Sequence, residues 1–213
     1  DPAHASFLHR FLEDEDPEDS YGKQFRDKAA DTDIPMTKLL RDYPRPDISV
    51  EETDYGMRII ALRHLDNDKT HVRITNQIFP EAISIPMSSE MIITQWHVPI
   101  DDEHCYWYSM FTSFDKPVDK EVMRAQRLKE HRLPDYAPLK NKTNTYGFNS
   151  EEQKHKTYTG MGLDINVHDQ WAVESPGAIF DRTKEHLGKT DVAIIKYRRM
   201  MRAAIANLSE GNP

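Results

Sequence analysis

Apolar and polar residues alternate through much of the middle of the chain, beginning near Tyr55. The stretch Met57-Arg58-Ile59 begins the pattern, and Val72-Arg73-Ile74 repeats it after a polar turn at residues 66–68. A period of two is typical of β-strands, because successive side chains of a strand point to opposite faces. The pattern predicts strands at about residues 55–64, 71–79, 82–86, 90–98 and 104–114. Since the connections are short, we expect consecutive strands to pair as an antiparallel meander.

Helical spacing replaces this alternation after Pro117. It predicts helices at about residues 118–133, 168–175 and 190–208, and residues 1–12 also have helical character. Along the last helix, apolar residues recur three and four positions apart, so we expect this stripe to pack inward. The stripe consists of Ile194, Tyr197, Met201, Ala204, Ile205 and Leu208.

The remaining stretches, residues 20–50 and 135–163, show little periodicity and are predicted to be irregular. The order of elements is therefore helix, strands, helices. This order predicts an α+β fold in which a long C-terminal helix lies on a curved antiparallel sheet.

The composition limits the classes of protein to which the chain can belong. A length of 213 residues suits one domain, and a single cysteine, Cys105, excludes an internal disulfide or a cysteine-rich metal site. The net charge is −8, and six acids lie together between Glu13 and Asp19, so the remainder carries −8 + 6 = −2. Because the chain has no basic stripe, nucleic acid is a poor partner. No apolar run approaches the ~18 residues of a membrane span, and the low cysteine content fits a reducing cytoplasm.

The first nine residues contain a candidate metal-binding pattern. Asp1, His4 and His9 form a D-x-x-H-x4-H arrangement, and neutral imidazole is a common ligand of divalent ions. In a regular α-helix, an offset of five residues turns two side chains about 140° apart. His4 and His9 therefore reach one ion only if the helix is irregular between them, and we expect such a departure, for example a π-type bulge. Two histidines at this spacing are also common without a metal in a chain that has ten.

A candidate third ligand lies near the other end of the chain. Asp169 stands beside Trp171 and Val173, and a carboxylate buried among bulky residues needs a partner or a cation. Together with His4 and His9 it would form two histidines and one carboxylate, the triad that holds Fe(II) in non-haem oxygenases and leaves coordination positions open.

Several motifs, in order along the chain, make this interpretation more specific. Residues 1–10 resemble the iron-binding motif of the α subunits of Rieske non-haem iron ring-hydroxylating oxygenases, and most of all of their phthalate 4,5-dioxygenase branch. Val98–Asp102 resembles a P-x-D-D strand end of that family, and residues 168–179 resemble the segment that supplies its carboxylate ligand. Residues 181–188 and 191–199 complete the resemblance to the catalytic, C-terminal domain of these subunits.

The resemblance implies a helix-grip (START/Bet v1-like) fold, with residues 1–213 forming one catalytic mononuclear iron domain. It implies that His4, His9 and Asp169 hold Fe(II), and that Asp1 accepts the free ring N–H of His4 and bridges the two metal centres. Electrons would come from the Rieske [2Fe-2S] cluster of a neighbouring subunit in a homotrimer or hexamer, supplied by NAD(P)H through a reductase or ferredoxin. Such a cluster needs two cysteines and two histidines, so the single cysteine indicates that the Rieske domain is absent from this chain. The expected substrates are O2 and an aromatic, phthalate-like acid, acted on in the cytoplasm.

Some positions depart from the family pattern. Pro176 and Ala178 stand where Met and Pro are expected, and His168 precedes Asp169 where Gln is usual. A phthalate-like acid would also need a cation, and Arg10 or Arg58 could provide it, although surface solvation is the more common role for each.

Other functions remain compatible with the sequence. Dihydroxylation, monohydroxylation and aryl-ether O-demethylation share the same iron site within the family. A non-catalytic carrier of hydrophobic ligands would use the same fold without a metal. A zinc hydrolase would use the same ligands, although the chain lacks the H-E-x-x-H spacing and an obvious general base.

Overall fold

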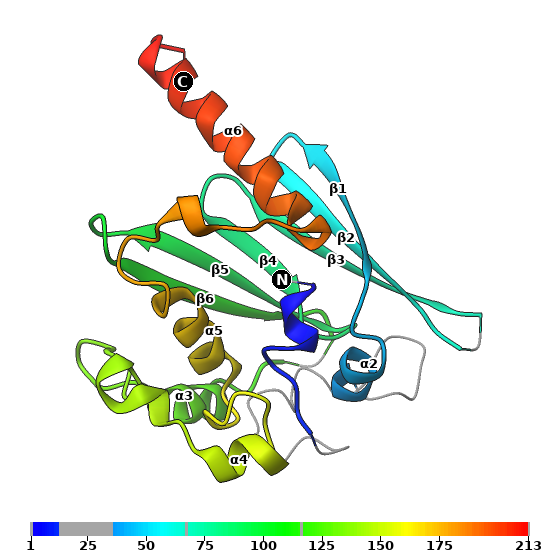
Figure 1. Ribbon diagram of the computed structural model, residues 1–213, viewed down its shortest axis with the longest axis vertical. Coiled ribbons are helices and arrows are strands. Elements are labelled where there is room, and N and C mark those ends of the chain that lie inside the picture. The colour runs from blue at the N-terminus through cyan, green and yellow to red at the C-terminus, as the bar shows by residue number, and fades with distance from the viewer. Residues whose placement is uncertain (1, 13–35, 67, 116, 213) are drawn as a thin grey trace.

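The computed structural model describes residues 2–12, 36–66, 68–115 and 117–212, and it has an antiparallel sheet of six strands in the order β1-β2-β3-β4-β5-β6 (Figure 1). The strands are β1 Asp47–Thr53, β2 Gly56–His64, β3 Thr70–Ile78, β4 Ala82–Pro86, β5 Met91–Pro99 and β6 Cys105–Ser113. Five of them lie where the alternating pattern predicts, and the meander is confirmed. The first part of β1, up to Val50, falls in the stretch of residues 20–50 that was expected to be irregular.

The helices surround one side of this sheet. They are η1 His4–Ser6, α2 Met36–Asp42, α3 Lys120–Leu128, η2 Lys142–Gly147, α4 Ser150–His155, α5 Ile165–Glu174, η3 Arg182–Lys184, η4 Lys189–Asp191 and α6 Val192–Ser209. The structure contains α2, η2 and α4 where irregular chain was predicted, and α3 is shorter than expected. The short η2 and α4 begin at the capping side chains Asn141 and Asn149, and such short elements carry too few turns to show a hydrophobic period.

The two faces of the sheet differ in burial. On β2, Met57, Ile59 and Ala61 are buried on the face that we call the inner face, and Arg58 lies on the opposite, outer face. Strand pairing places Thr75 beside Ile59 on the inner face. On β3 the buried inner side chains are polar, namely Arg73, Thr75 and Gln77, whereas the apolar Val72, Ile74 and Ile78 are exposed on the outer face. The inner face therefore carries polar groups beneath the helical layer.

Helices α3 and α5 pack on the inner face at the β5 side of the sheet. Ile93 of β5 forms a buried cluster with Met123 of α3, Ile165 of α5 and Met87. A second cluster joins Val167 of α5 to residues of η2 and the loop before α5. These contacts fix the axis of α5 relative to the sheet (Figure 1).

Helix α6 packs on the sheet only through its first turns. Lys196 pairs with Glu52 of β1 at 2.7 Å, and the Tyr197 hydroxyl donates to the carbonyl oxygen of Pro80 at 2.9 Å. Further along, Ile205 and Leu208 are 58% and 67% exposed, and the helix extends past the sheet (Figure 1). The prediction that the whole apolar stripe packs inward is therefore wrong: no residue of α6 is buried, Ile194 in its first turn is 43% exposed, and the far end of the helix extends past the sheet. Among the described residues, no helix is long and apolar enough to cross a membrane.

Candidate metal centre

The N-terminal histidines lie on a tight turn rather than on a regular helix. After η1, the His4 carbonyl oxygen accepts hydrogen bonds from the backbone N–H groups of Phe7 and Leu8, at 2.9 and 2.7 Å, and turns continue through His9. A continuous helix through residue 12 is therefore wrong. The predicted local departure from α geometry is present, as a 3-10 turn instead of a π-type bulge. This departure brings two side chains five residues apart to the same side.

The side chain of Arg63 connects this turn to the sheet through hydrogen bonds. This side chain, only 1% exposed, is on the inner face of β2. The guanidinium donates to the carbonyl oxygens of Pro2 at 2.8 Å and Tyr43 at 2.9 Å, and to the hydroxyl of Ser6 at 3.3 Å. Burial, with a contribution from the charge of Arg73, lowers the Arg63 pKa to about 10. The backbone of the histidine segment is thereby held against a buried cation.

Helix α5 carries Asp169 and is held at both ends. At its start, the Asp164 carboxylate accepts hydrogen bonds from two backbone N–H groups of the first turn and pairs with Arg127 of α3. At its end, the Tyr146 hydroxyl donates to Glu174 at 2.6 Å. These contacts restrict sliding and rotation of the helix, and so fix the direction of the Asp169 side chain.

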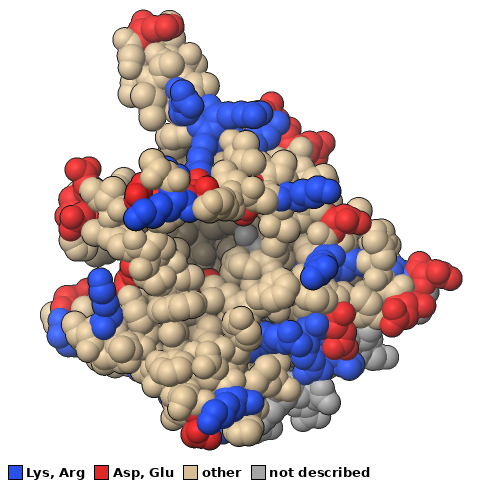
Figure 2. Space-filling model, in the orientation of Figure 1, with Lys and Arg blue, Asp and Glu red and all other residues tan. Residues whose placement is uncertain are grey.

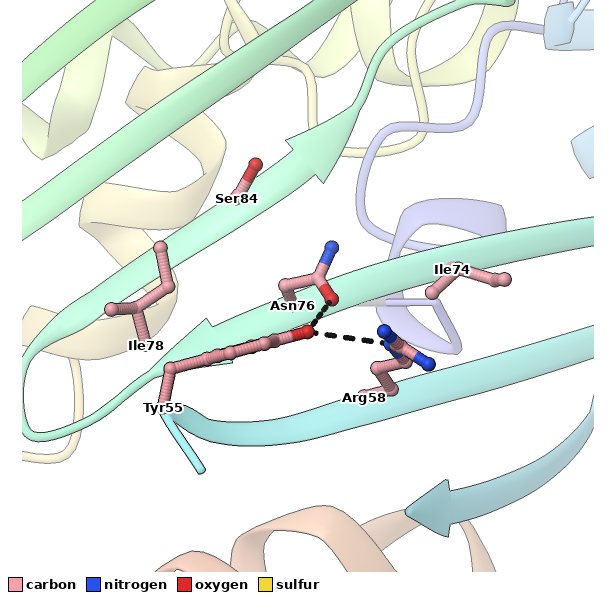
Figure 3. Close-up of a pocket in the computed structure, with 6 residues that line it drawn as sticks. All are labelled: Tyr55, Arg58, Ile74, Asn76, Ile78 and Ser84. Atoms are coloured by element: carbon pink, nitrogen blue, oxygen red, sulfur yellow. Dashed lines mark hydrogen bonds between the residues drawn. The ribbon is translucent and has the colours of Figure 1, made fainter. Parts of the chain in front are cut away.

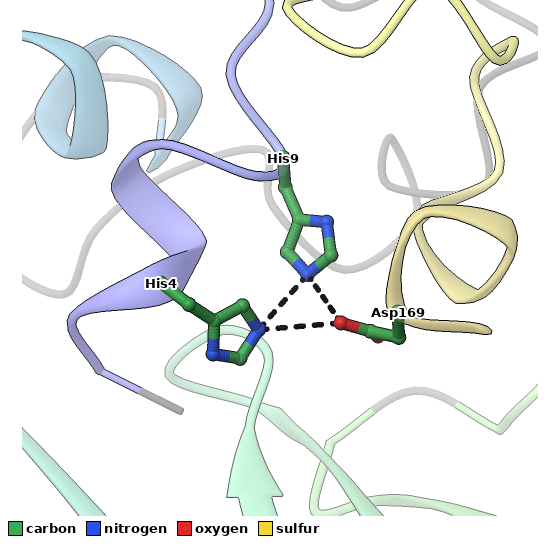
Figure 4. Close-up of side chains that lie close together, drawn as sticks. All are labelled: His4, His9 and Asp169. Carbon is green, nitrogen blue, oxygen red and sulfur yellow. Dashed lines mark hydrogen bonds and ion pairs between the residues drawn. The ribbon is translucent and has the colours of Figure 1, made fainter. Parts of the chain in front are cut away.

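His4, His9 and Asp169 converge on one point (Figure 4). The Nε2 atoms of His4 and His9 are 3.2 Å apart, and each lies close to the same Asp169 oxygen, Oδ1, at 3.3 and 3.2 Å respectively. The His9 side chain is 7% exposed, whereas Asp169 and His4 retain 26% and 41% exposure. The cluster is therefore buried on the His9 side and open on the His4 side.

This spacing fits a divalent ion. Ligand atoms at about 2.0–2.1 Å from a metal lie about 3.0 Å apart on one face of an octahedron and about 3.4 Å apart in a tetrahedron. The observed separations of 3.2, 3.2 and 3.3 Å fall between these values. Two imidazoles and one carboxylate are also the donor set of the non-haem Fe(II) facial triad. The residues present therefore fit a metal ion, without distinguishing iron from zinc.

The electrostatics of the cluster favour a cation. Burial raises the pKa of Asp169, but the charges and hydrogen bonds of His9 and His4 outweigh burial and hold the pKa well below its usual range. The carboxylate is therefore ionised. A negative oxygen facing two imidazole nitrogens needs a proton or a metal ion between them, because lone pairs at this distance repel one another.

Residues outside the three-residue cluster include some that the sequence suggested. Asp1 lies outside the described residues. The rings of His97 and Trp107 lie on the inner face in a tilted arrangement, with centroids 5.3 Å apart. Burial lowers the pKa of His97, against a hydrogen bond with the backbone of Glu81 and the charge of Asp169. The space-filling view shows a hollow over the sheet beside the N-terminal segment (Figure 2). Cys105 is exposed at the start of β6.

Arg58 is on the wrong face to meet a substrate at this site. It lines a shallow pocket of about 590 Å³ on the outer face with Tyr55, Asn76 and three further residues (Figure 3). There its guanidinium donates to the Tyr55 hydroxyl at 3.3 Å, and that hydroxyl donates to Asn76 at 2.8 Å. The sheet separates this pocket from His4, His9 and Asp169.

Sequence reasoning missed the supporting residues Arg63, Arg127 and Tyr146. Only Arg63 could have been found from the sequence. It follows Met57, Ile59 and Ala61 at a spacing of two residues, so a charged residue occupies a position expected to be in the core. Arg127 and Tyr146 contact residues of other helices that are distant in the sequence, so no local pattern predicts these contacts.

Comparison with known proteins gives a family match over nearly the whole chain. The family model described as "LigXa C-terminal domain like" matches residues 2–213. This match agrees with the resemblance that the motifs indicate.

Curated relatives give the same picture. The chain is 32% identical over 174 residues to the phthalate 4,5-dioxygenase oxygenase subunit of Pseudomonas putida, covering 78% of this chain and 39% of that protein. It is 26% identical over 178 residues to the 3-chlorobenzoate-3,4-dioxygenase oxygenase subunit of Comamonas testosteroni, covering 75% and 41%. It is 24% identical over 170 residues to the phenoxybenzoate dioxygenase subunit alpha of Ectopseudomonas oleovorans, covering 78% and 36%. The matched region spans about two fifths of the length of these relatives.

Proposed function

Because the chain belongs to the LigXa C-terminal-domain-like family, we propose that it is the mononuclear iron domain of a Rieske-type ring-hydroxylating oxygenase. The observation that best supports this proposal is the convergence of His4, His9 and Asp169, whose three donor atoms lie 3.2–3.3 Å apart. The proposed reaction is hydroxylation of an aromatic acid with O2, as the names of the relatives suggest for those proteins.

In this proposal the protein supplies position and charge. Bound Fe(II) would supply the redox chemistry that activates O2. His9 and Asp169 hold their donor atoms on rigid, partly buried supports, and His4 closes the ligand face on the exposed side. The hollow that Figure 2 shows would receive the aromatic ring.

The electron supply belongs to the proposal as well. We expect a [2Fe-2S] Rieske cluster from a neighbouring subunit of a homotrimer or hexamer, reduced by NAD(P)H through a reductase or ferredoxin in the cytoplasm. Asp1 would accept the ring N–H of His4 and connect the two metal centres. In the intact oxygenase, Asp1→Asn should leave iron bound but nearly abolish product formation; an unchanged product yield would remove Asp1 from the electron path.

The test of the iron site is metal analysis of the chain purified without oxygen. We expect about one iron per chain in the wild type and loss of iron in Asp169→Ala, His4→Ala and His9→Ala. Stoichiometric zinc would favour a hydrolase instead. A chain that takes up neither Fe(II) nor Zn(II), even after anaerobic reconstitution, would favour the carrier of hydrophobic ligands. Product analysis with phthalate, 3-chlorobenzoate and phenoxybenzoate, using the intact oxygenase, would then identify the substrate.

A further inference from the structure

A third histidine, His168, lies directly behind the metal-facing residues. It is on α5, next to Asp169 in sequence, and is only 1% exposed. Its ring lies beside that of His9 and nearly parallel to it, with centroids 5.6 Å apart and an interplanar angle of 27°. Its Nδ1 lies 3.4 Å from Nδ1 of His9, at the long end of hydrogen bonding, and its Nε2 lies 2.9 Å from the carbonyl oxygen of Gly162.

These contacts determine which nitrogen carries the proton in each ring. A carbonyl oxygen only accepts, so Nε2 of His168 must carry the hydrogen. In a neutral imidazole the other nitrogen then has a lone pair, and Nδ1 of His168 accepts the N–H of His9 Nδ1. His9 consequently presents an unprotonated Nε2, and this is the atom that faces His4 and Asp169.

We propose that His168 is a positioning residue that fixes the tautomer and orientation of His9 for metal binding. This inference rests on the proposed function, since it requires a metal ion at His4, His9 and Asp169. One helix, α5, then controls two ligands: it carries Asp169 directly, and it holds His9 through the ring of the preceding residue. The relay from Gly162 through His168 to His9 also ties the ligand to the loop that leads into α5.

Substitution of His168 tests the role while the three ligands stay in place. His168→Phe keeps the ring shape but removes both nitrogens, and we expect it to weaken Co(II) and Fe(II) binding by about 10–100-fold. His168→Gln keeps one acceptor for His9 and one donor for Gly162, and its affinity should return to within about 3-fold of the wild type. His64→Leu is the control, because His64 contacts Asp47 and Thr70 instead of the metal ligands.

Affinity is measured anaerobically on the full chain by titration with Co(II), and the visible absorption of bound Co(II) reports the ligand geometry. Thermal unfolding of each variant shows whether it is folded. A folded His168→Phe variant with wild-type affinity and an unchanged Co(II) spectrum would overturn the role. Equal weakening in the Phe and Gln variants would also overturn it, because packing rather than hydrogen bonding would then explain the loss.

A measurement on the unmutated chain keeps the inference testable if His168→Phe does not fold. In the Zn(II)-loaded chain, ¹⁵N NMR of the histidine rings should show His168 protonated on Nε2 and unprotonated on Nδ1. The opposite tautomer would overturn the inference. If the wild type binds no metal, or if His4→Ala, His9→Ala and Asp169→Ala bind it as tightly as the wild type, the proposed function itself fails and this role fails with it. Wild-type binding that depends on those three residues, with no effect at His168, overturns only the positioning role.

Discussion

Arg127 and Asp164 form an ion pair that joins α3 to the first turn of α5. Asp164 is 7% exposed and also accepts hydrogen bonds from the backbone N–H groups of Asn166 and Val167. One carboxylate thus starts the helix that carries Asp169 and connects this helix to its neighbour. The position of a metal ligand therefore depends on a side chain of another helix.

Removing this cation should destabilise the protein and loosen the metal site. Arg127→Ala leaves a buried carboxylate without its ion-pair partner, and we expect a loss of about 3 kcal/mol in the free energy of unfolding. Urea unfolding measures this loss, and Co(II) titration should show weaker binding. Arg124→Ala is the matched control on the same helix: Arg124 is 66% exposed and pairs with the exposed Glu121, so the change should stay within about 0.5 kcal/mol. Similar losses in both variants would contradict this account.

Arg63 should be required for metal affinity although it touches no metal ligand. Arg63→Leu removes three hydrogen bonds and leaves the carbonyl oxygens of Pro2 and Tyr43 without this donor. We expect a destabilisation of about 2–3 kcal/mol and about 10-fold weaker Co(II) binding, since the histidine turn is no longer fixed. Arg58→Leu, on the exposed face of the same strand, should leave affinity unchanged. Wild-type Co(II) affinity in a folded Arg63→Leu variant would contradict this role, because the histidine turn would then keep its position without Arg63.

The hairpin between β1 and β2 should tolerate only glycine at position 56. Gly56 has φ +144°, and a Cβ there would lie 2.2 Å from the backbone oxygen of Gln77. Gly56→Ala therefore combines strain with a backbone clash and should cost about 2–3 kcal/mol. Gly211→Ala is the control, because Gly211 also has a positive φ, +78°, but has no atoms within 4 Å of the added carbon. Its cost, from thermal unfolding, should be about 1 kcal/mol or less.

His71 should make the stability of the metal-free chain depend on pH. Burial, with added repulsion from Arg63 and Arg73, lowers the pKa of His71 to about 4. In the unfolded chain its ordinary pKa is about 6.5, so between these values the unfolded state binds more protons than the folded state. The free energy of unfolding should therefore fall as the pH is lowered from about 6.5 towards 4. His71→Gln should reduce this slope, measured by urea unfolding at several pH values, and an unchanged slope in this variant would contradict the assignment.

Much of the fold follows from local patterns in the sequence. The strands from β2 to β6 lie where residues alternate, because a period of two is a property of the strand itself. The set His4, His9 and Asp169 was also proposed from the sequence, because these residue types suit a divalent ion and because residues 1–10 and 168–179 resemble the iron-binding segments of a known family. The irregularity between the two histidines followed from helix geometry once both were taken as ligands of one ion, although the kind of turn did not.

Only the tertiary structure decided which side of each strand is buried and which residues support the ligands. On β3 the polar side chains, including Arg73 and Thr75, point to the inner face. The pairing register with β2 determines which side chains of β3 point inward, whatever their polarity. The apolar stripe of α6 is left exposed where the sheet beneath it ends. Likewise, His168 acquires its role only when α5 places its ring behind His9, a residue from the other end of the chain. Sequence determines local periodicity and chemical type, whereas contacts between distant segments exist only after the chain has folded.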